Sequence, residues 1–261
     1  MSTDPRIIFI IPYRDREQQL SFFKRHMKYI LEDMSPDDYK IYYVQQNDKR
    51  EFNRGALKNI GFLAMRDKYP NSYQDITFVF NDVDTMPYTK NFLDYDTTNG
   101  VIKHFYGFLF ALGGIFSIKG RDFERIRGFP NFWAWGFEDN LIQKRALNAN
   151  LVIDRNQFYP YLDKNILQIT DGMMRNVNRT EFDRYTQNVM EGFQSIRNLQ
   201  YTINEEIGCI LVNQFLTDIV EDVSAKKIHD LRNGSKPFRS KGSRNATLPM
   251  MNLANNFKII R

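Results

Sequence analysis

Arg6-Ile-Ile-Phe-Ile-Ile-Pro-Tyr13 is a continuous apolar run of strand length near the start of this 261-residue chain. A run without polar alternation suits a parallel strand that is covered on both faces. Apolar residues then recur at helical spacing at Leu20, Phe23, Met27, Ile30 and Leu31. The segment therefore predicts a buried strand followed by a helix that ends before Ser35-Pro36.

The strand and helix pattern repeats further along the chain. Residues 41–44 predict a second strand, residues 57–64 a second helix and residues 76–80 a third strand. Strands that alternate with helices predict an α/β domain with a mostly parallel central sheet. In such sheets ligands bind at the carboxyl ends of the strands, and Asn81-Asp82-Val83-Asp84 follows the third predicted strand at that end.

The elements after the third strand are less regular. Residues 88–110 form an aromatic stretch without clear periodicity, and residues 111–118 predict a strand with a glycine step. Two helices are predicted at 122–126 and 141–147, the second opened by two acids in its first turn. Past Asp183 we expect one more helix and then a pair of strands, at 199–203 and 207–211.

The overall composition is that of a folded protein, with 42% hydrophobic, 15% aromatic and 26% charged residues. This excludes disordered and fibrous classes. We expect no transmembrane anchor, because no run of about 18 apolar residues occurs. Residues 225–261 hold nine Lys and Arg against one acid. We therefore divide the chain into a catalytic domain at 1–224 and a basic tail at 225–261, which we interpret as solvated rather than as a nucleic-acid site.

The acidic triplet Asp82-Val83-Asp84 places two carboxylates on the same side of an extended segment. Such a pair can share a hard cation, because Mn2+ and Mg2+ take oxygen ligands and keep positions open for substrate phosphates. Short acidic triplets at strand ends are also common as plain solvated turns. The triplet alone leaves both interpretations open.

A second acidic segment contains the only two tryptophans of the chain, Trp133-Ala-Trp135-Gly-Phe-Glu138-Asp139. Aromatic faces pack against the apolar faces of sugar rings. Carboxylates accept hydrogen bonds from sugar hydroxyls, and one of them can act as a general base. The competing interpretation places the tryptophans in the core and the acids at a helix start.

Taken in order, six segments resemble the beta-1,4-galactosyltransferase family, which is glycosyltransferase family 7 of the GT-A type. They are Ile11-Pro-Tyr-Arg-Asp-Arg16, Phe52-Asn-Arg-Gly55, Asn81-Asp-Val-Asp84, Gly113-Gly114, Gly128-Phe-Pro-Asn131 and Trp133-Ala-Trp-Gly-Phe-Glu-Asp139. The resemblance covers roughly residues 7–190. It implies a GT-A-like domain with a Rossmann-type nucleotide-binding half and a metal-dependent, inverting transfer of a sugar from a UDP-sugar to a glycan or glycoconjugate hydroxyl.

The resemblance also implies roles for single residues. Asp84 would bind Mn2+, with Mg2+ as the alternative, and Glu138 and Asp139 would meet the sugar hydroxyls, with Asp139 as the base. Residues that would contact the nucleotide sugar are Pro12, Tyr13, Arg14, Arg16, Phe52, Arg54, Asp82, Val83, Gly114 and Trp135.

The chain departs from the family pattern at several positions. Asn140 replaces a third carboxylate, and Ala111 stands where these enzymes usually carry a tyrosine in the donor pocket. The family's second metal motif has no literal match, and Gln168 and Asp171 lie nearest to it, so we take them as candidate metal ligands. The donor is therefore galactose or a related hexose or N-acetylhexosamine, and a non-catalytic nucleotide-sugar or carbohydrate-binding protein is the alternative function.

The expected compartment also differs from that of animal members, which are anchored in the Golgi and carry disulfides. This chain has a single cysteine, Cys209, which fits a reducing compartment. We expect a soluble viral or microbial member in the cytoplasm of its host or in a virion, and a Golgi lumen location only for a trimmed fragment.

Overall fold

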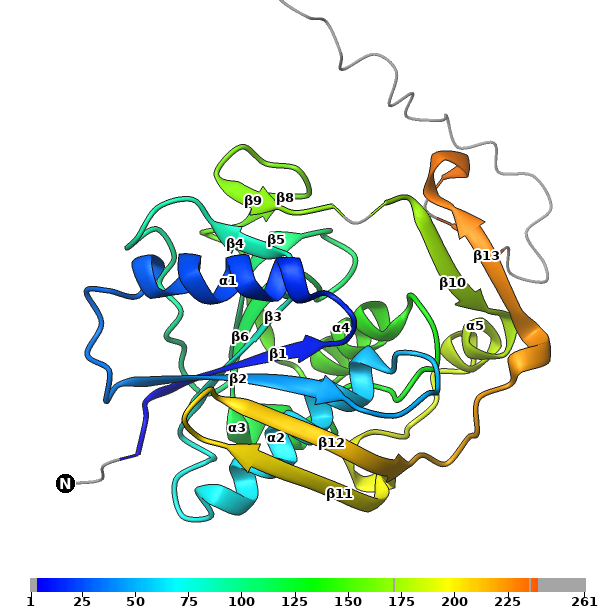
Figure 1. Cartoon of the computed structure of the whole chain (residues 1–261), viewed down its shortest axis with the longest axis horizontal. Helices are drawn as coiled ribbons and strands as arrows, with labels where there is room; N and C mark the ends of the chain where they lie inside the picture. The colour runs from blue at the N-terminus through cyan, green and yellow to red at the C-terminus, as the bar shows by residue number, and fades with distance from the viewer. Residues whose placement is uncertain (1–3, 171, 235, 239–261) are drawn as a thin grey trace, which may run out of the picture.

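A computed structural model describes residues 4–170, 172–234 and 236–238 (Figure 1). The α-helices are α1 (Glu17–Ile30), α2 (Arg54–Lys68), α3 (Gly120–Arg125), α4 (Glu138–Asn148) and α5 (Arg179–Thr186). Strands of the first half are β1 (Ile7–Tyr13), β2 (Tyr39–Gln46), β3 (Thr77–Asn81), β4 (Thr85–Pro87), β5 (Val101–Gly107) and β6 (Ile115–Lys119). Those of the second half are β7 (Val152–Asp154), β8 (Tyr159–Pro160), β9 (Ile166–Gln168), β10 (Met174–Asn178), β11 (Arg197–Asn204), β12 (Cys209–Leu216) and β13 (Lys226–Asp230). Short 3-10 turns lie at η1 (Phe193–Ser195), η2 (Val223–Ala225) and η3 (Leu231–Asn233).

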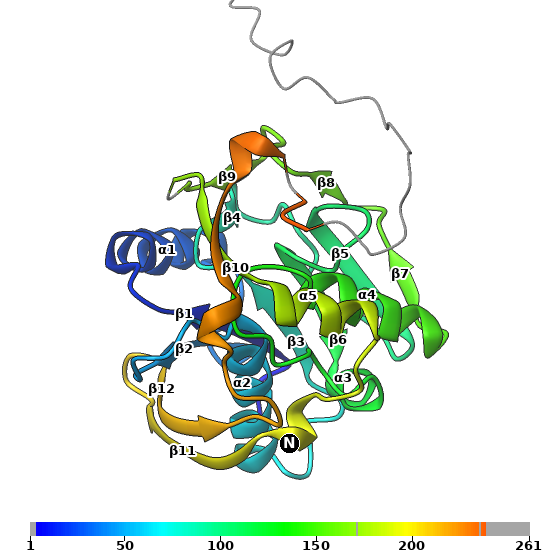
Figure 2. The same ribbon diagram turned by 90° about the vertical axis from the view of Figure 1, so that its right-hand side faces the viewer.

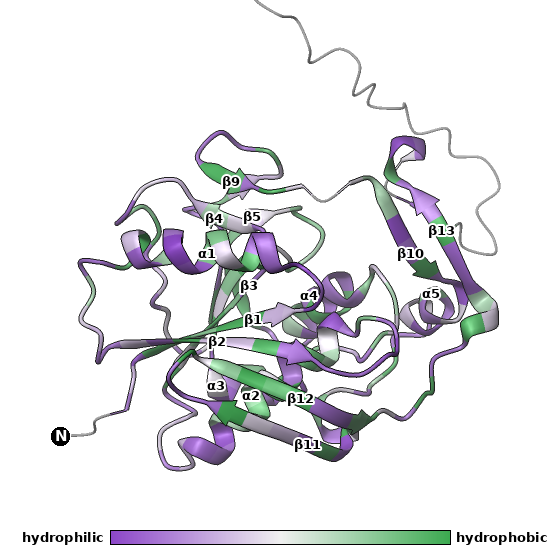
Figure 3. Cartoon of the chain, in the orientation of Figure 1, coloured by the Kyte–Doolittle hydropathy of each residue, from purple (hydrophilic) through white to green (hydrophobic). Residues whose placement is uncertain are grey.

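Strand β1 lies in the middle of the sheet and is buried along its whole length. Because alternate side chains of a strand point to opposite faces, it feeds two cores. Ile8 and Ile10 join a core with α2, α3 and α4, whereas Phe9 and Ile11 join a core with α1. The domain therefore has three layers, with the sheet between two layers of helices. Much of α1, one of the outer helices, is coloured purple for hydrophilic residues in Figure 3.

The main sheet is mixed and mostly parallel, as the sequence predicted. Its strand order is β11-β12-β2-β1-β3-β6-β5-β7, with β8 beside β5. Strands β12, β2, β1 and β3 run parallel, and β5 runs parallel to β7 and β8. The pairs β3–β6, β5–β6 and β11–β12 are antiparallel. Strand order reverses at β1, whose neighbours are β2 and β3, and such a switch point opens a crevice at the carboxyl ends.

Three predictions on the irregular part of the chain were wrong in detail. The aromatic stretch 88–110 contains strand β5, which has no alternation because most of it is buried on both faces. Strand β6 begins at Ile115 instead of at residue 111, because the backbone of Gly114 takes a φ of 69° that breaks an extended strand. The last α-helix lies at Arg179–Thr186, before the place we expected, because the Asn178 side chain caps it by accepting from the Thr180 amide.

Part of the predicted basic tail pairs with the body of the protein. Strand β13 runs antiparallel to β10, from Met174↔Asp230 to Asn178↔Lys226. Figures 1 and 2 show this two-stranded ribbon at one end of the molecule, near α5. The residues from 239 onward lie outside the described part. Among the described residues, no helix combines the length and the apolar character that a membrane crossing requires.

Candidate active site

Arg54 connects the two acidic segments that the sequence singled out. Its Nη2 donates to both carboxylate oxygens of Asp82 at 2.7 Å, and its Nη1 donates to Glu138 Oε1 at 2.5 Å and to Asp139 Oδ2 at 2.9 Å. These carboxylates come from the end of β3 and from the first turn of α4. One guanidinium therefore holds together side chains that lie more than fifty residues apart in the sequence.

The position of Arg54 follows from how α2 begins. Asn53 caps this helix, because its side chain accepts from the Ala56 amide at 2.9 Å, so Arg54 is the first helical residue. The next residue must be small, since a Cβ on Gly55 would lie 2.2 Å from the Pro130 carbonyl oxygen. The Asn59 side chain then binds both the amide and the carbonyl of Phe129. The Phe52–Gly55 and Gly128–Asn131 segments are thus one packed unit.

The turn after β3 presents Asp82 and Asp84 differently. The side-chain Nδ2 of Asn81 donates to the backbone carbonyls of Asp82 and Thr85 at 2.7 and 2.8 Å and so fixes the turn. Asp84 Oδ2 accepts from Arg16 at 3.0 Å, and Asp84 Oδ1 accepts from the Thr85 hydroxyl at 2.9 Å. The two carboxylates of the triplet therefore pair with two different arginines.

The loop before α4 has a strained backbone, and this backbone conformation places Glu138 and Asp139 at the site. Ala134, Gly136 and Phe137 have φ values of 124°, 103° and 74°, and two of these residues carry a Cβ. Phe137 is held by ring contacts with Phe182 and Tyr185 of α5, with centroids 5.0 and 5.1 Å away. The backbone conformation turns Glu138 and Asp139 toward Arg54.

Gly113 lies directly against the carboxylate of Asp139. A Cβ at this position would approach Asp139 Oδ2 to 2.6 Å, and the Leu112 amide donates to the Asp139 carbonyl at 2.9 Å. The neighbouring carbonyl of Gly114 accepts from the Asp82 amide at 3.1 Å. The glycine pair therefore touches both acidic segments, which explains why two small residues stand there.

The two tryptophans of the second segment have different environments. Trp133 is 1% exposed, stacks on Phe215 at 5.5 Å between centroids and donates from its indole nitrogen to Thr217 Oγ1 at 3.1 Å. Trp135 is 39% exposed, and its backbone amide donates to the carbonyl of Asn176. The core interpretation therefore holds for Trp133, and only Trp135 offers a ring to a ligand.

We expect this difference to appear in stability. Trp133→Ala should lower the free energy of unfolding by about 3–5 kcal/mol, because it removes a fully buried ring and leaves a cavity. Trp135→Ala should change it by about 1 kcal/mol or less, since the ring is partly exposed. Urea unfolding of both variants measures the difference, and equal losses would contradict this division of roles.

Burial and charge both act on the ionisable groups of the cluster. Burial alone would lower the pKa of Arg54, but Asp139, Asp82 and Glu138 raise it well above its ordinary value. Burial raises the pKa of Glu138, and the neighbouring Asp139 raises it further. Burial would likewise raise the pKa of Asp82, yet Arg54 brings it below its usual range. Arg54 therefore keeps Asp82 ionised.

Sequence reasoning missed Lys58, which lies beneath Arg54 in this cluster. The residue is fully buried, and its Nζ lies 3.5 Å from Asp139 Oδ1 and 3.7 Å from Asp82 Oδ1. The spacing offered a signal, because residues four apart share one face of a helix and Arg54 was already a candidate.

The remaining predicted residues lie at the end of β1, just before α2 and in the turn after β3. Arg14 donates to the Arg50 carbonyl, and Tyr13 and Val83 belong to the core on the α1 side. Phe52 packs partly buried against the other core. Pro12 is a buried residue of β1, in register with Val44. Their contacts with a nucleotide sugar stay predictions.

Asp84 and Gln168 are the predicted metal ligands that the structure places near each other. Thr85 pairs with Gln168 between β4 and β9. Its hydroxyl lies 2.9 Å from Asp84 Oδ1 and 3.1 Å from Gln168 Oε1, so its one proton can be donated to either side chain. Both offer oxygen atoms, which suits Mn2+ or Mg2+. Asp171 lies outside the described residues. Among those described, no three His, Cys, Asp or Glu side chains gather as a metal site.

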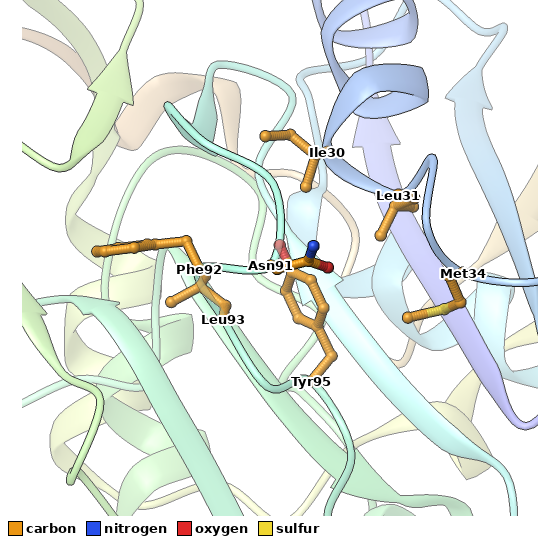
Figure 4. A pocket seen from close by; sticks show the side chains of 7 residues that line it. All are labelled: Ile30, Leu31, Met34, Asn91, Phe92, Leu93 and Tyr95. Atoms are coloured by element: carbon orange, nitrogen blue, oxygen red, sulfur yellow. The ribbon is translucent and has the colours of Figure 1, made fainter.

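A small cavity of about 30 Å³ lies elsewhere, between the end of α1 and the 91–95 segment (Figure 4). Figure 4 shows the largely apolar side chains that line it, among them Ile30, Met34 and Tyr95. Its volume fits one water molecule and no sugar. None of the acidic cluster lines it.

Two family models match adjoining parts of the chain and together cover residues 2–166. Residues 2–95 match the N-terminal region of glycosyl transferase group 7, and residues 94–166 match the model described as the N-terminal domain of galactosyltransferase. The chain belongs to the glycosyl transferase group 7 family. The family resemblance inferred from the motifs is confirmed.

Curated relatives agree with this membership. The xylosylprotein 4-beta-galactosyltransferase of Caenorhabditis elegans is 31% identical over 160 residues, which cover 58% of this chain and 53% of the relative. The beta-1,4-galactosyltransferase 1 of Mus musculus is 29% identical over 226 residues, covering 82% and 55%. This chain therefore spans about half the length of the curated relatives that it matches.

Solved structures show the same fold. The catalytic domain of Drosophila beta-1,4-galactosyltransferase 7 in complex with xylobiose aligns with a TM-score of 0.64 at 22% identity, covering 84% of this chain and 96% of that chain. A mutant of the same enzyme, in complex with manganese, UDP-Gal and xylobiose, aligns with a TM-score of 0.61 at 20% identity. The GT-A-type fold predicted from the sequence is confirmed.

Proposed function

We propose that this protein is an inverting, metal-dependent glycosyltransferase that moves a hexose or an N-acetylhexosamine from a UDP-sugar to a hydroxyl group of a glycan or glycoconjugate. The observation that carries the proposal is the four-residue cluster in which Arg54 binds Asp82, Glu138 and Asp139. It joins the segment expected at the nucleotide to the segment expected at the sugars. The UDP-Gal and manganese of the Drosophila enzyme support the same assignment.

In the proposed reaction Asp139 takes the proton of the acceptor hydroxyl. The acceptor oxygen forms a bond to the anomeric carbon as the bond from that carbon to the diphosphate breaks, and the UDP oxygen keeps the electron pair. Gly113 leaves room beside Asp139, since any side chain there would meet the carboxylate at 2.6 Å. Arginines at the end of β1, Arg14 and Arg16, supply donors suited to a diphosphate.

Asp84 and Gln168 would hold the metal ion, in the proposal Mn2+ with Mg2+ as the alternative. Burial raises the pKa of Asp84, and the charge of Asp82 raises it further, so a bound cation would offset an unfavourable position for a carboxylate. A bound divalent cation supplies charge stabilisation for the leaving diphosphate. In the structure, the positive charge next to Asp84 comes from Arg16, whose Nη1 lies 3.0 Å from Asp84 Oδ2.

An aromatic rim supports a carbohydrate acceptor. Phe108 stacks on Phe110 and on Tyr161, with 5.2 Å between centroids in both pairs, and all three rings are exposed. The Asn140 side chain, one residue after Asp139, donates to the Phe110 carbonyl at 3.2 Å. Exposed aromatic faces beside a carboxylate suit the apolar face and the hydroxyls of a sugar.

The test is turnover of a panel of UDP-sugars with Mn2+ present and after chelation. We expect one donor to be used, and its use to stop on chelation.

The choice of donor can be tested at Ala111, which is buried two residues before Gly113 and stands where the family usually carries a tyrosine. Ala111→Tyr should shift the kcat/KM ratio toward unsubstituted hexoses by about tenfold or more, because it fills the donor pocket.

Nucleotide binding without turnover of any donor, with a range of acceptors present, would contradict the enzyme proposal. It would favour the alternative, a nucleotide-sugar or carbohydrate-binding protein of the same fold. Cytoplasmic location belongs to the same proposal and rests on the single cysteine, which is unpaired in the structure.

A further inference from the structure

Lys58 is a buried cation at the floor of the candidate site. Its ammonium group lies between Asp139 and Asp82, at 3.5 and 3.7 Å, and 4.6 Å above the centre of the Phe129 ring. Within the described part of the chain its Nζ makes no hydrogen bond. An ammonium group in such a position has a high desolvation cost unless nearby charges stabilise it.

The cluster around Asp139 contains groups of both signs. Arg54 and Lys58 face it from α2, and Glu138 is its neighbour on α4. Asp82 shares both cations, and His104 of β5 lies behind Gly113, whose carbonyl its ring contacts at 3.2 Å. Burial lowers the pKa of Lys58 and the charge of Arg54 lowers it further, while the carboxylates act in the opposite direction.

The two cations differ in what they can reach. The side chain of Arg54 is 19% exposed, whereas that of Lys58 is 1% exposed. An anionic ligand such as a diphosphate can therefore attract Arg54 but cannot touch Lys58. If Arg54 shares its charge with a ligand, Lys58 is the cation that remains beside Asp139 and Asp82.

We propose that Lys58 is a positioning residue whose positive charge, 3.5 Å from Asp139 Oδ1, holds that carboxylate in place for proton abstraction while Arg54 interacts with the donor. This inference rests on the proposed function of Asp139 as the base. Lys58 acts only through the carboxylates, because its burial excludes contact with either substrate. Its loss should therefore affect the carboxylate of Asp139 more than it affects nucleotide binding.

The first test measures the resting protein and needs no turnover. Carbon-13 NMR of labelled aspartate side chains follows the titration of Asp139, whose signal is assigned by its loss in Asp139→Asn. In Lys58→Met, which keeps the length of the side chain, we expect the midpoint of this signal to move up by about one pH unit or more. Lys58→Gln should give the same direction, and Lys68→Met, on the same helix but paired with Glu205, should leave the midpoint unchanged.

An unchanged midpoint in either folded Lys58 variant would overturn the proposal. If both variants fail to fold, nitrogen-15 NMR of the lysine side chains in the unaltered protein gives the answer. The Lys58 signal should then show a step at the midpoint of Asp139, and the absence of that step overturns the proposal as well.

Kinetics separate this inference from the proposed function. With the donor that the unaltered protein uses, Lys58→Met should lower kcat about tenfold at neutral pH and move the acidic limb of the pH–rate profile to higher pH. The affinity for UDP, measured by calorimetry, should change by less than about threefold. A protein that uses no donor contradicts the proposed function, while the NMR midpoints still decide the role of Lys58.

Discussion

Replacing Asp139 by Asn lowers kcat for sugar transfer by about 10²- to 10⁴-fold, whereas UDP still binds. The amide keeps the shape of the side chain, but it cannot accept the proton of the acceptor hydroxyl. Arg54 retains Asp82 and Glu138 as partners, so the cluster should stay assembled. Steady-state transfer rates and calorimetry with UDP measure the two effects separately.

The matched control is Asp183→Asn, which removes a carboxylate of α5 that pairs with Arg179 at the surface. We expect this variant to keep its full rate of transfer. Comparable rates for Asp139→Asn and the unaltered protein would remove Asp139 from the chemistry and leave Glu138 as the carboxylate to examine. A loss of UDP binding in Asp139→Asn would instead show that the cluster collapses without its charge.

Much of the fold follows from patterns that the sequence displays. The Arg6–Tyr13 run predicts a doubly covered strand, because both faces of β1 pack against helices and no position needs to be polar. The helical spacing of the apolar residues from Leu20 to Leu31 predicts α1, because these residues form the one face of the helix that packs on the sheet. Strand β5 lacked such a signal, since Lys103 and His104 interrupt its apolar run although most of the strand is buried.

The candidate site could be predicted in part. Asp82 and Asp139 stood in segments of unusual composition, and the rule that ligands bind at the carboxyl ends of strands placed the first of them. The contact between the two segments depends on Arg54 and on the left-handed backbone at Phe137, which no local pattern indicates. Lys58 was missed because a lysine inside a helix normally lies at the surface.

Replacing Asp84 by Ala should weaken Mn2+ binding by at least about 10- to 100-fold and should lower kcat by about 10²- to 10⁴-fold. The physical reason is the loss of a carboxylate oxygen that would hold the cation next to the leaving diphosphate. Arg16, which Asp84 binds at 3.0 Å, cannot replace the metal, because it offers a single charge. The signal of free Mn2+ in electron paramagnetic resonance, recorded with UDP present, measures the affinity.

The control for this change is Asp15→Ala, which removes an exposed carboxylate on the same side of the sheet, beside Arg14. It should leave both the metal affinity and the rate unchanged. If Asp84→Ala keeps the rate and still responds to chelation, the metal ligand lies elsewhere, and Gln168→Ala becomes the deciding variant. If it keeps the rate and no longer responds to chelation, Arg14 and Arg16 stabilise the leaving diphosphate without a metal, and the reaction is not metal-dependent.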